Sequence, residues 1–189
     1  MFSIESEENS IKNSLIVVEI LFLTAAIFSV IKYGDSFLLG SLEKFDNDDV
    51  KYIRSVWNYM DIGIISCENI KEPTVYMMPG LTIILSFFMI TFGKIDGLTA
   101  FRIFQAILQG ASIYLIFLIG RKVFGSKTAL IACILDALYV VEIFAANTIL
   151  TECTFKFLLL LLVYISIWAV ETRSLKLYAG AYSVKPIRA

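Results

Sequence analysis

The sequence predicts an all-α integral membrane protein with about four transmembrane helices and with interfacial helices in its first outer loop. Of the 189 residues, 58% are hydrophobic and only 17% are charged. Soluble domains contain roughly 45–50% apolar and about 25% charged residues, so this composition is typical of membrane proteins. The apolar residues also form runs that are long enough to cross a bilayer of about 30 Å, which takes roughly 17–25 helical residues.

Four apolar runs have the length of a membrane span. The first, residues 14–31, is interrupted only by Glu19, and its length and acidic leader favour an uncleaved span over a signal peptide. The other three contain a few charged residues, which are costly inside a bilayer. We expect these three spans at residues 98–120, 128–146 and 153–170.

The long loop between the first two spans covers residues 32–97. Part of it is uncharged and apolar, but Pro79–Gly80 interrupts this part. The remaining apolar piece, residues 81–93, has a length that is more typical of a re-entrant or interfacial segment than of a full span. The loop charges decide between these two readings.

Two short turns, which follow the second and the fourth predicted span, are basic. Their charged residues are Arg121, Lys122, Lys127, Arg173 and Lys176. The positive-inside rule assigns both turns to the cytoplasm, which requires that residues 81–93 do not cross the membrane. We therefore predict a multi-pass protein of the cell membrane with a cytoplasmic N-terminus. Residues 32–97 and the turn at 147–152 then lie outside.

Composition also excludes some classes of function. The formal net charge of −1 offers no basic surface for nucleic acid. Histidine is absent, so acid–base chemistry falls to carboxylates, lysine, tyrosine or cysteine. The three cysteines, Cys67, Cys133 and Cys153, lie far apart and predict neither a disulfide framework nor a zinc site.

The densest acidic cluster lies in the first loop, in the stretch FDNDDVKYIRSVWNYM at residues 45–60. Its apolar residues recur at spacings of three and four, which predicts an amphipathic helix. Trp57 and Tyr59 suit the interfacial aromatic belt, so this helix is expected to lie along the membrane surface.

The aspartates of this cluster fall at the start of the expected helix. Asp46 or Asn47 can cap it, and Asp48 and Asp49 then occupy its first turn. The helix macrodipole stabilises carboxylates there by about 0.3–1 kcal/mol. The same placement keeps an aspartate ionised at the membrane edge, as a general base requires. Periodicity alone leaves capping and catalysis open.

Four segments recur in a characteristic order along the chain. They are DDVKY, EPTVYMMPGLTIILSFFMITFG, LTAFRIFQAILQGASIYLIFLIGRKVFG and NTILTE. In this order they resemble the polytopic glycosyltransferases that use polyprenyl-phosphate sugars, namely the protein O-mannosyltransferases and the lipid A aminoarabinose transferases. In that family, a D-E/D-x-x-Y element lies in the first outer loop and a T-D/E pair opens a later span. The resemblance covers roughly residues 14–177.

The resemblance implies part of a C-type glycosyltransferase membrane domain and an inverting sugar transfer. Asp48 would be the general base that takes a proton from the acceptor hydroxyl, with Asp49 as its neighbour, Asp46 left as the cap, and Tyr52 completing the element. The donor would be a polyprenyl-phosphate sugar in the membrane, and the sugar and the acceptor stay open. Its phosphate needs charge neutralisation more than protonation.

The resemblance and the loop charges suggest further site residues. Lys71 and Arg102 are the candidate cations for the phosphate. Glu152 either forms a helix ion pair with Lys156, four residues on, or lies beside Asp48 to orient the acceptor. No cofactor is predicted firmly, although Asp49 and Glu152 could share a divalent cation such as Mg or Mn.

Two alternatives remain open at this level. The chain could be a non-enzymatic multi-span membrane protein, such as part of a permease or a scaffold, or an inactive remnant of the transferase. After ETRSLKLYAGAY, where another span could begin, the sequence continues only with SVKPIRA. We therefore expect an N-terminal fragment that is inactive by itself.

Overall fold

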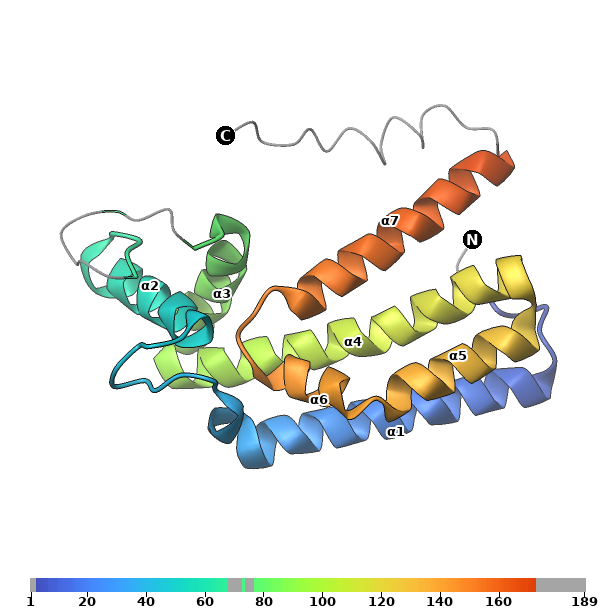
Figure 1. Ribbon diagram of the computed structural model, residues 1–189, viewed down its shortest axis with the longest axis horizontal. Helices are drawn as coiled ribbons and strands as arrows, with labels where there is room; N and C mark the ends of the chain where they lie inside the picture. The colour runs from blue at the N-terminus through green and yellow to red at the C-terminus, as the bar shows by residue number, and fades with distance from the viewer. Residues whose placement is uncertain (1–2, 68–72, 74–76, 173–189) are drawn as a thin grey trace. The chain divides into compact units, whose positions relative to one another are not determined.

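The computed structural model describes residues 3–67, 73 and 77–172, and within these residues it contains helices and no strands (Figure 1). The seven α-helices and one 3-10 helix are α1 (Asn9–Tyr33), η1 (Gly34–Phe37), α2 (Asp48–Ile62), α3 (Pro79–Phe92), α4 (Lys94–Phe124), α5 (Ser126–Leu138), α6 (Val140–Asn147) and α7 (Glu152–Thr172). The all-α fold class is therefore confirmed.

Three stretches of the described chain are long and apolar enough to cross a membrane. They are α1 together with η1, α4, and α7, and the pair α5 and α6 makes a fourth if it is one bent span. Large apolar side chains of α1 are exposed, among them Ile16, Ile20 and Leu21. Exposed apolar side chains carry a free-energy cost in water but not in lipid. Together with the three or four candidate spans, their exposure identifies a multi-pass membrane protein.

The third apolar run is not one straight helix. The chain bends by 56° between α5 and α6, at Tyr139, which adopts an extended conformation. The sequence analysis places a single span at residues 128–146, which contain neither proline nor glycine to indicate a break. The bend therefore reflects the contacts that α6 makes rather than a local helix breaker.

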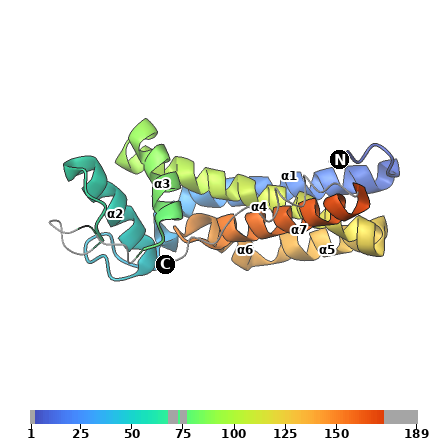
Figure 2. The same ribbon diagram turned by 90° about the horizontal axis from the view of Figure 1, so that it is seen from above.

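Helix α3 is too short to be a full span, and it lies beside α2 (Figures 1 and 2). Gly93 follows α3 with a φ of 89°, so the chain reverses there and enters α4. Gly97, in the first turn of α4, comes very close to α3: a Cβ at this position would lie 2.5 Å from Cα of Met89. The two helices therefore pack backbone to backbone at this reversal.

The described residues group into two compact units, and each is described here by itself. The basic-turn unit consists of residues 3–22, 110–138 and 155–172. The loop unit consists of the described residues within 23–109 together with 139–154. Helices α1, α4 and α7 contribute residues to both units.

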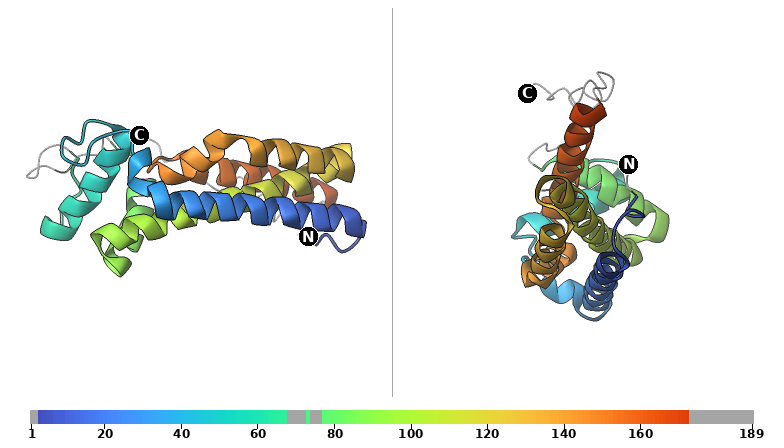
Figure 3. Two further views of the ribbon diagram at one scale, coloured as in Figure 1. Left: turned by 90° about the horizontal axis from the view of Figure 1, so that it is seen from below. Right: turned by 90° about the vertical axis from the view of Figure 1, so that its right-hand side faces the viewer.

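In the basic-turn unit, α5 returns along the C-terminal part of α4 (Figure 3). Arg121 of α4 pairs with Glu7, which precedes α1, at 3.4 Å, and Lys122 pairs with Glu171 of α7. The start of α1 and the ends of α4 and α7 therefore lie at the same end of this unit. A small core of Leu115, Leu118 and Tyr164 packs between α4 and α7.

The loop unit has the larger core, and this core joins the first loop to the membrane helices. Its buried members come from α2, the segment between α2 and α3, α3, the first turns of α4 and the turn before α7. They are Tyr52, Ile53, Val56, Cys67, Met77, Leu81, Leu85, Met89, Leu98, Phe101 and Ile149. Tyr52 and Ile149 thus pack in one cluster although they are far apart in the sequence.

The close approach of α4 to α3 leads to a stability prediction. Gly97→Ala should destabilise the protein by about 1–3 kcal/mol, because the added methyl group meets backbone atoms that cannot rotate away. Gly80→Ala is the matched control: it lies in α3 with no atom within 4 Å of the added Cβ, and it should stabilise the helix by up to about 1 kcal/mol. Unfolding in detergent measures both changes. Equal stabilities of the two variants would contradict the close packing.

Candidate functional site

An open pocket of about 450 Å³ lies in the loop unit, where the start of α2 meets the start of α7. It is lined by Asp48, Tyr52, Met77, Met78, Leu150, Thr151 and Glu152. Of the six site residues predicted from the sequence, the structure brings three together in this lining: Asp48, Tyr52 and Glu152. The lining therefore combines two carboxylic acids, a phenol and a hydroxyl group with apolar side chains.

The start of α2 is fixed by Asn47, which is the N-cap residue. Its backbone is extended, and its side-chain oxygen accepts a hydrogen bond from the backbone N–H of Asp48 at 2.7 Å. The choice of Asp46 as the cap was wrong, because its Oδ1 instead accepts a hydrogen bond from the backbone N–H of Ser41 at 2.8 Å. This hydrogen bond lowers the pKa of the Asp46 carboxyl below its ordinary value.

Asp49 is held away from the pocket lining. It is fully buried, and its Oδ2 accepts a hydrogen bond from the backbone N–H of Leu39 at 2.6 Å. Its Oδ1 accepts another from the N–H of Val50 at 2.8 Å. Both oxygens of Asp49 thus bind backbone amides, and the residue fastens the loop that follows η1 to the first turn of α2.

Asp48 differs from both neighbouring aspartates. It is the first residue of α2, and its side chain is 60% exposed. The Nζ atom of Lys51, one helical turn on, lies 3.9 Å from Asp48 Oδ1. A solvent-exposed pair at this distance contributes little to stability. Asp48 therefore presents a carboxylate to the pocket and remains accessible to a ligand.

Tyr52 lies one turn after Asp48, on the same face of α2, and is buried with only 5% of its surface exposed. Burial is the largest cause that raises the pKa of its phenol above the ordinary value of 10. A hydrogen bond with the Met78 backbone lowers this pKa, and the negative charges of Asp48 and Glu152 raise it. The phenol is therefore neutral at physiological pH and can donate a hydrogen bond to a ligand in the pocket.

Glu152 is the first residue of α7, and it reaches the pocket from the turn that follows α6. The ion pair that the structure shows for Lys156 is with Asp136 of α5, at 2.9 Å, rather than with Glu152. Of the two alternatives left open by the sequence, the structure agrees with Glu152 lying beside Asp48. The two acids face the same pocket from helices that are about a hundred residues apart.

Arg102 lies outside this lining. It is buried, its Nε donates to the carbonyl oxygen of Asn147 at 2.9 Å, and its Nη1 donates to Oδ1 of Asp35 at 2.7 Å. Its other terminal nitrogen, Nη2, is buried without a hydrogen-bond partner among the described residues. These contacts tie η1, α4 and the end of α6 together. Lys71, the other predicted cation, lies outside the described residues.

The glutamines on the polar face of α4 were given no role from the sequence. Gln105 donates from Nε2 to the carbonyl oxygen of Leu150 at 3.2 Å, and Gln109 donates from Nε2 to Sγ of Cys153 at 3.3 Å. With Arg102 these side chains recur at spacings of three and four on one face of an otherwise apolar helix. This spacing was a readable signal, because polar residues inside a span are expensive.

The described residues offer few ligands for a divalent cation. Within the described part of the chain, no three side chains of His, Cys, Asp or Glu come together as a metal-binding group. Asp49 is occupied by backbone amides, so it is not positioned to share an ion with Glu152.

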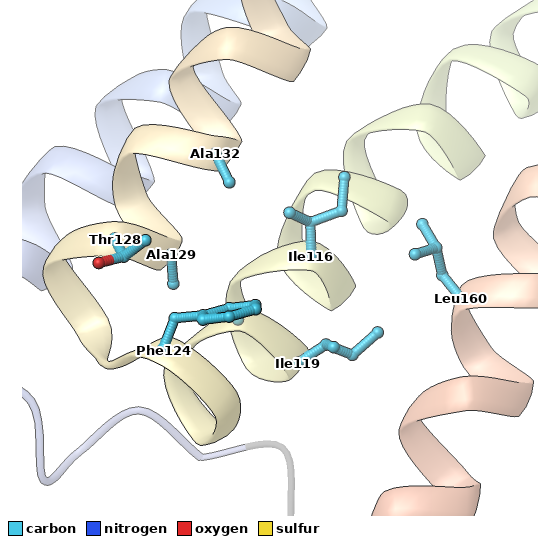
Figure 4. Close-up of a pocket in the computed structure, with 8 residues that line it drawn as sticks. Ile116, Ile119, Phe124, Thr128, Ala129, Ala132 and Leu160 are labelled. Carbon is cyan, nitrogen blue, oxygen red and sulfur yellow. The ribbon is translucent and has the colours of Figure 1, made fainter.

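A second cavity of about 240 Å³ lies in the basic-turn unit (Figure 4). Figure 4 shows that Ile116, Ile119 and Phe124 of α4 approach it from one side and Leu160 of α7 from another. Its wall is almost entirely apolar, with Thr128 as its one hydroxyl side chain. It holds no group that could perform acid–base chemistry, so the pocket at Asp48 is the candidate active site.

Comparison with known families identifies the family of the chain. A family model described as dolichyl-phosphate-mannose-protein mannosyltransferase matches residues 71–184, more than half of the chain. The matched range includes Arg102 and Glu152, whereas Asp48 and Tyr52 precede it. No curated protein and no solved structure matches the chain.

The environment of Tyr52 can be tested by titration. The phenolate absorbance of the wild type minus that of Tyr52→Phe should give a midpoint above 10, and Glu152→Gln should move this midpoint down, because it removes a nearby negative charge.

Because the folded state favours the neutral phenol, the contribution of Tyr52 to stability is complete below about pH 10 and is lost as the pH rises through the folded-state pKa. A midpoint at or below 10 would contradict the described pocket.

Proposed function

The chain belongs to the dolichyl-phosphate-mannose-protein mannosyltransferase family, and from this premise we propose that it transfers a sugar from a polyprenyl-phosphate donor to an acceptor hydroxyl, with inversion at the anomeric carbon. The observation that carries the proposal is the pocket in which the exposed carboxylate of Asp48 faces Tyr52 and Glu152. Without histidine, carboxylates are among the side chains that can act as the base, and of Asp46, Asp48 and Asp49 it is Asp48 that lines the pocket.

In the proposed reaction, Asp48 accepts the proton of the acceptor hydroxyl as that oxygen attacks the anomeric carbon. The bond between the anomeric carbon and the phosphate oxygen breaks, and its electron pair leaves with the polyprenyl phosphate. The proton ends on Asp48. Because the phosphate leaves as a stable anion, no general acid is needed, and attack from the opposite face inverts the anomeric centre.

The other lining residues would bind the acceptor. The neutral phenol of Tyr52 can donate a hydrogen bond to an acceptor oxygen, and the Glu152 carboxylate can accept one from a second hydroxyl group. Met77 and Met78 form an apolar wall, which suits the non-polar face of a sugar ring or the lipid next to it.

The departing phosphate needs a positive charge. We assign this role to Lys71, which precedes Glu72–Pro73 in the segment leading to Met77. Arg102 already pairs with Asp35 and donates a hydrogen bond to the Asn147 carbonyl oxygen, so we assign it a structural role. Its Nη2 has no hydrogen-bond partner among the described residues and can donate to the phosphate of the sugar donor.

The proposed orientation puts the pocket on the outer side of the cell membrane and the N-terminus in the cytoplasm. The support is the basic turn of Arg121, Lys122 and Lys127, since short basic turns remain on the cytoplasmic side. The donor would then be used on the outer face, after its lipid carrier has crossed the bilayer.

Asp48→Asn should lower the transfer rate by at least about 100-fold in the full-length protein in lipid nanodiscs, because asparagine cannot accept the acceptor proton. Binding of the polyprenyl-phosphate sugar should persist, since Asp48 acts on the acceptor. The measurement is sugar transfer from a labelled donor, followed together with donor binding.

The matched control is Asp46→Asn. Its side-chain oxygen can still accept the hydrogen bond from Ser41, and Asp46 does not line the pocket, so transfer should remain close to the wild-type rate. Wild-type transfer by Asp48→Asn, or an equal loss in both variants, would refute Asp48 as the base.

A further inference from the structure

Three side chains of α4 contact the chain from the end of α6 to the start of α7. Arg102 donates to the carbonyl oxygen of residue 147 at the end of α6, Gln105 to that of residue 150 in the turn, and Gln109 to the sulfur of residue 153 in α7. The donors lie on one face of α4, and their acceptors advance along the chain in the same order. Within the turn itself, the side-chain contact from this face of α4 is the one made by Gln105.

The first two of these contacts meet a clear physical need. Helix α6 ends at Asn147 and α7 begins at Glu152, so the carbonyl groups between them lack the partners that a continuous helix supplies. Asn147, Thr148 and Ile149 are buried, so water does not reach the backbone there, and a buried carbonyl group without a hydrogen-bond partner is destabilising. Arg102 and Gln105 supply those partners.

Burying Gln105 is itself unfavourable, because one of its polar atoms is left without a hydrogen bond. It is completely buried, and its Oε1 has no hydrogen-bond partner among the described residues. An apolar side chain of similar length would avoid that cost and would suit a span better. The feature that only glutamine offers here is the N–H group that binds the Leu150 carbonyl.

The carbonyl that Gln105 holds belongs to the pocket wall. Leu150, Thr151 and Glu152 all line the pocket opposite Asp48 and Tyr52. The residue before this wall, Ile149, is buried in the same core as Tyr52, which anchors one end of it. Gln105 holds the wall at its first residue, so the placement of Glu152 relative to Asp48 depends on this hydrogen bond.

We propose that Gln105 is a positioning residue of the transfer site: it sets the Leu150–Glu152 wall at the distance from Asp48 at which an acceptor fits between them. This role rests on the proposed function. Gln109 binds one turn further along α4, to Cys153, which does not line the pocket. It therefore offers a matched control on the same helix face, also buried and also with an unpaired Oε1.

The first test compares Gln105→Met with Gln109→Met in the full-length protein. A misplacement of about 1 Å can cost on the order of 100-fold in rate, so Gln105→Met should lower kcat by about 10- to 100-fold while the KM for the donor stays near that of the wild type. Gln109→Met should keep a kcat near that of the wild type at a comparable loss of thermal stability. Equal kcat values for the two variants would overturn the positioning role.

A second test needs no activity. Spin labels at Asp48→Cys and Glu152→Cys report the separation across the pocket, and the three native cysteines are buried. The distance distribution should be narrow with Gln105, broader or shifted with Gln105→Met, and unchanged with Gln109→Met. An unchanged distribution in Gln105→Met would overturn the inference whatever the activity of the protein. A changed distribution, together with full transfer by Asp48→Asn, would support the positioning role and refute the proposed base.

If the Gln105→Met protein does not insert into the membrane, the variant Gln105→Glu provides another test. A protonated carboxyl group can donate to the Leu150 carbonyl, whereas a carboxylate cannot. The distance distribution of the labelled protein should therefore narrow at low pH and broaden as the pH rises. A distribution that is independent of pH would contradict the proposal.

Discussion

The structure depends on the pairing of backbone carbonyl groups at the break between α6 and α7. Asn147, Thr148 and Ile149 are buried away from solvent, so the carbonyl groups here need donors from other parts of the protein. Helix α4 provides them from Arg102 and Gln105, which bind the carbonyl oxygens of Asn147 and Leu150. Buried polar side chains inside an apolar helix would otherwise be destabilising. Here they allow a non-helical turn to enter the folded interior.

The same pairing brings the two halves of the site together. Arg102 also binds Asp35 of η1, so the first loop begins at a fixed point beside the turn. Asp49 then fastens that loop to the first turn of α2 through the N–H of Leu39. Since the core shared by Tyr52 and Ile149 closes the other side, the start of α2 is held against the turn by contacts at both ends. The pocket between them is a consequence of these contacts.

The sequence was sufficient for features that depend on local pattern, and insufficient for those that depend on distant partners. Long apolar runs predicted α1, α4 and α7, because length and composition decide whether a helix can span. The bend at Tyr139 has no proline or glycine to reveal it. The i,i+4 rule indicated a Glu152–Lys156 pair, but Asp136 on a neighbouring helix supplies the charge. Gln105 could have been identified, since its spacing from Arg102 and Gln109 was visible.

Asp46, Asp48 and Asp49, the acidic cluster of the first loop, show how geometry separates chemically identical residues. Asp46 binds the N–H of Ser41, and Asp49 binds those of Leu39 and Val50, so each stabilises a piece of irregular backbone. Asp48 lies between them in the sequence, yet it faces the pocket and is largely exposed. Asp46 and Asp49 therefore hold the loop through their side-chain oxygens, whereas Asp48 is the aspartate of this cluster that lines the pocket.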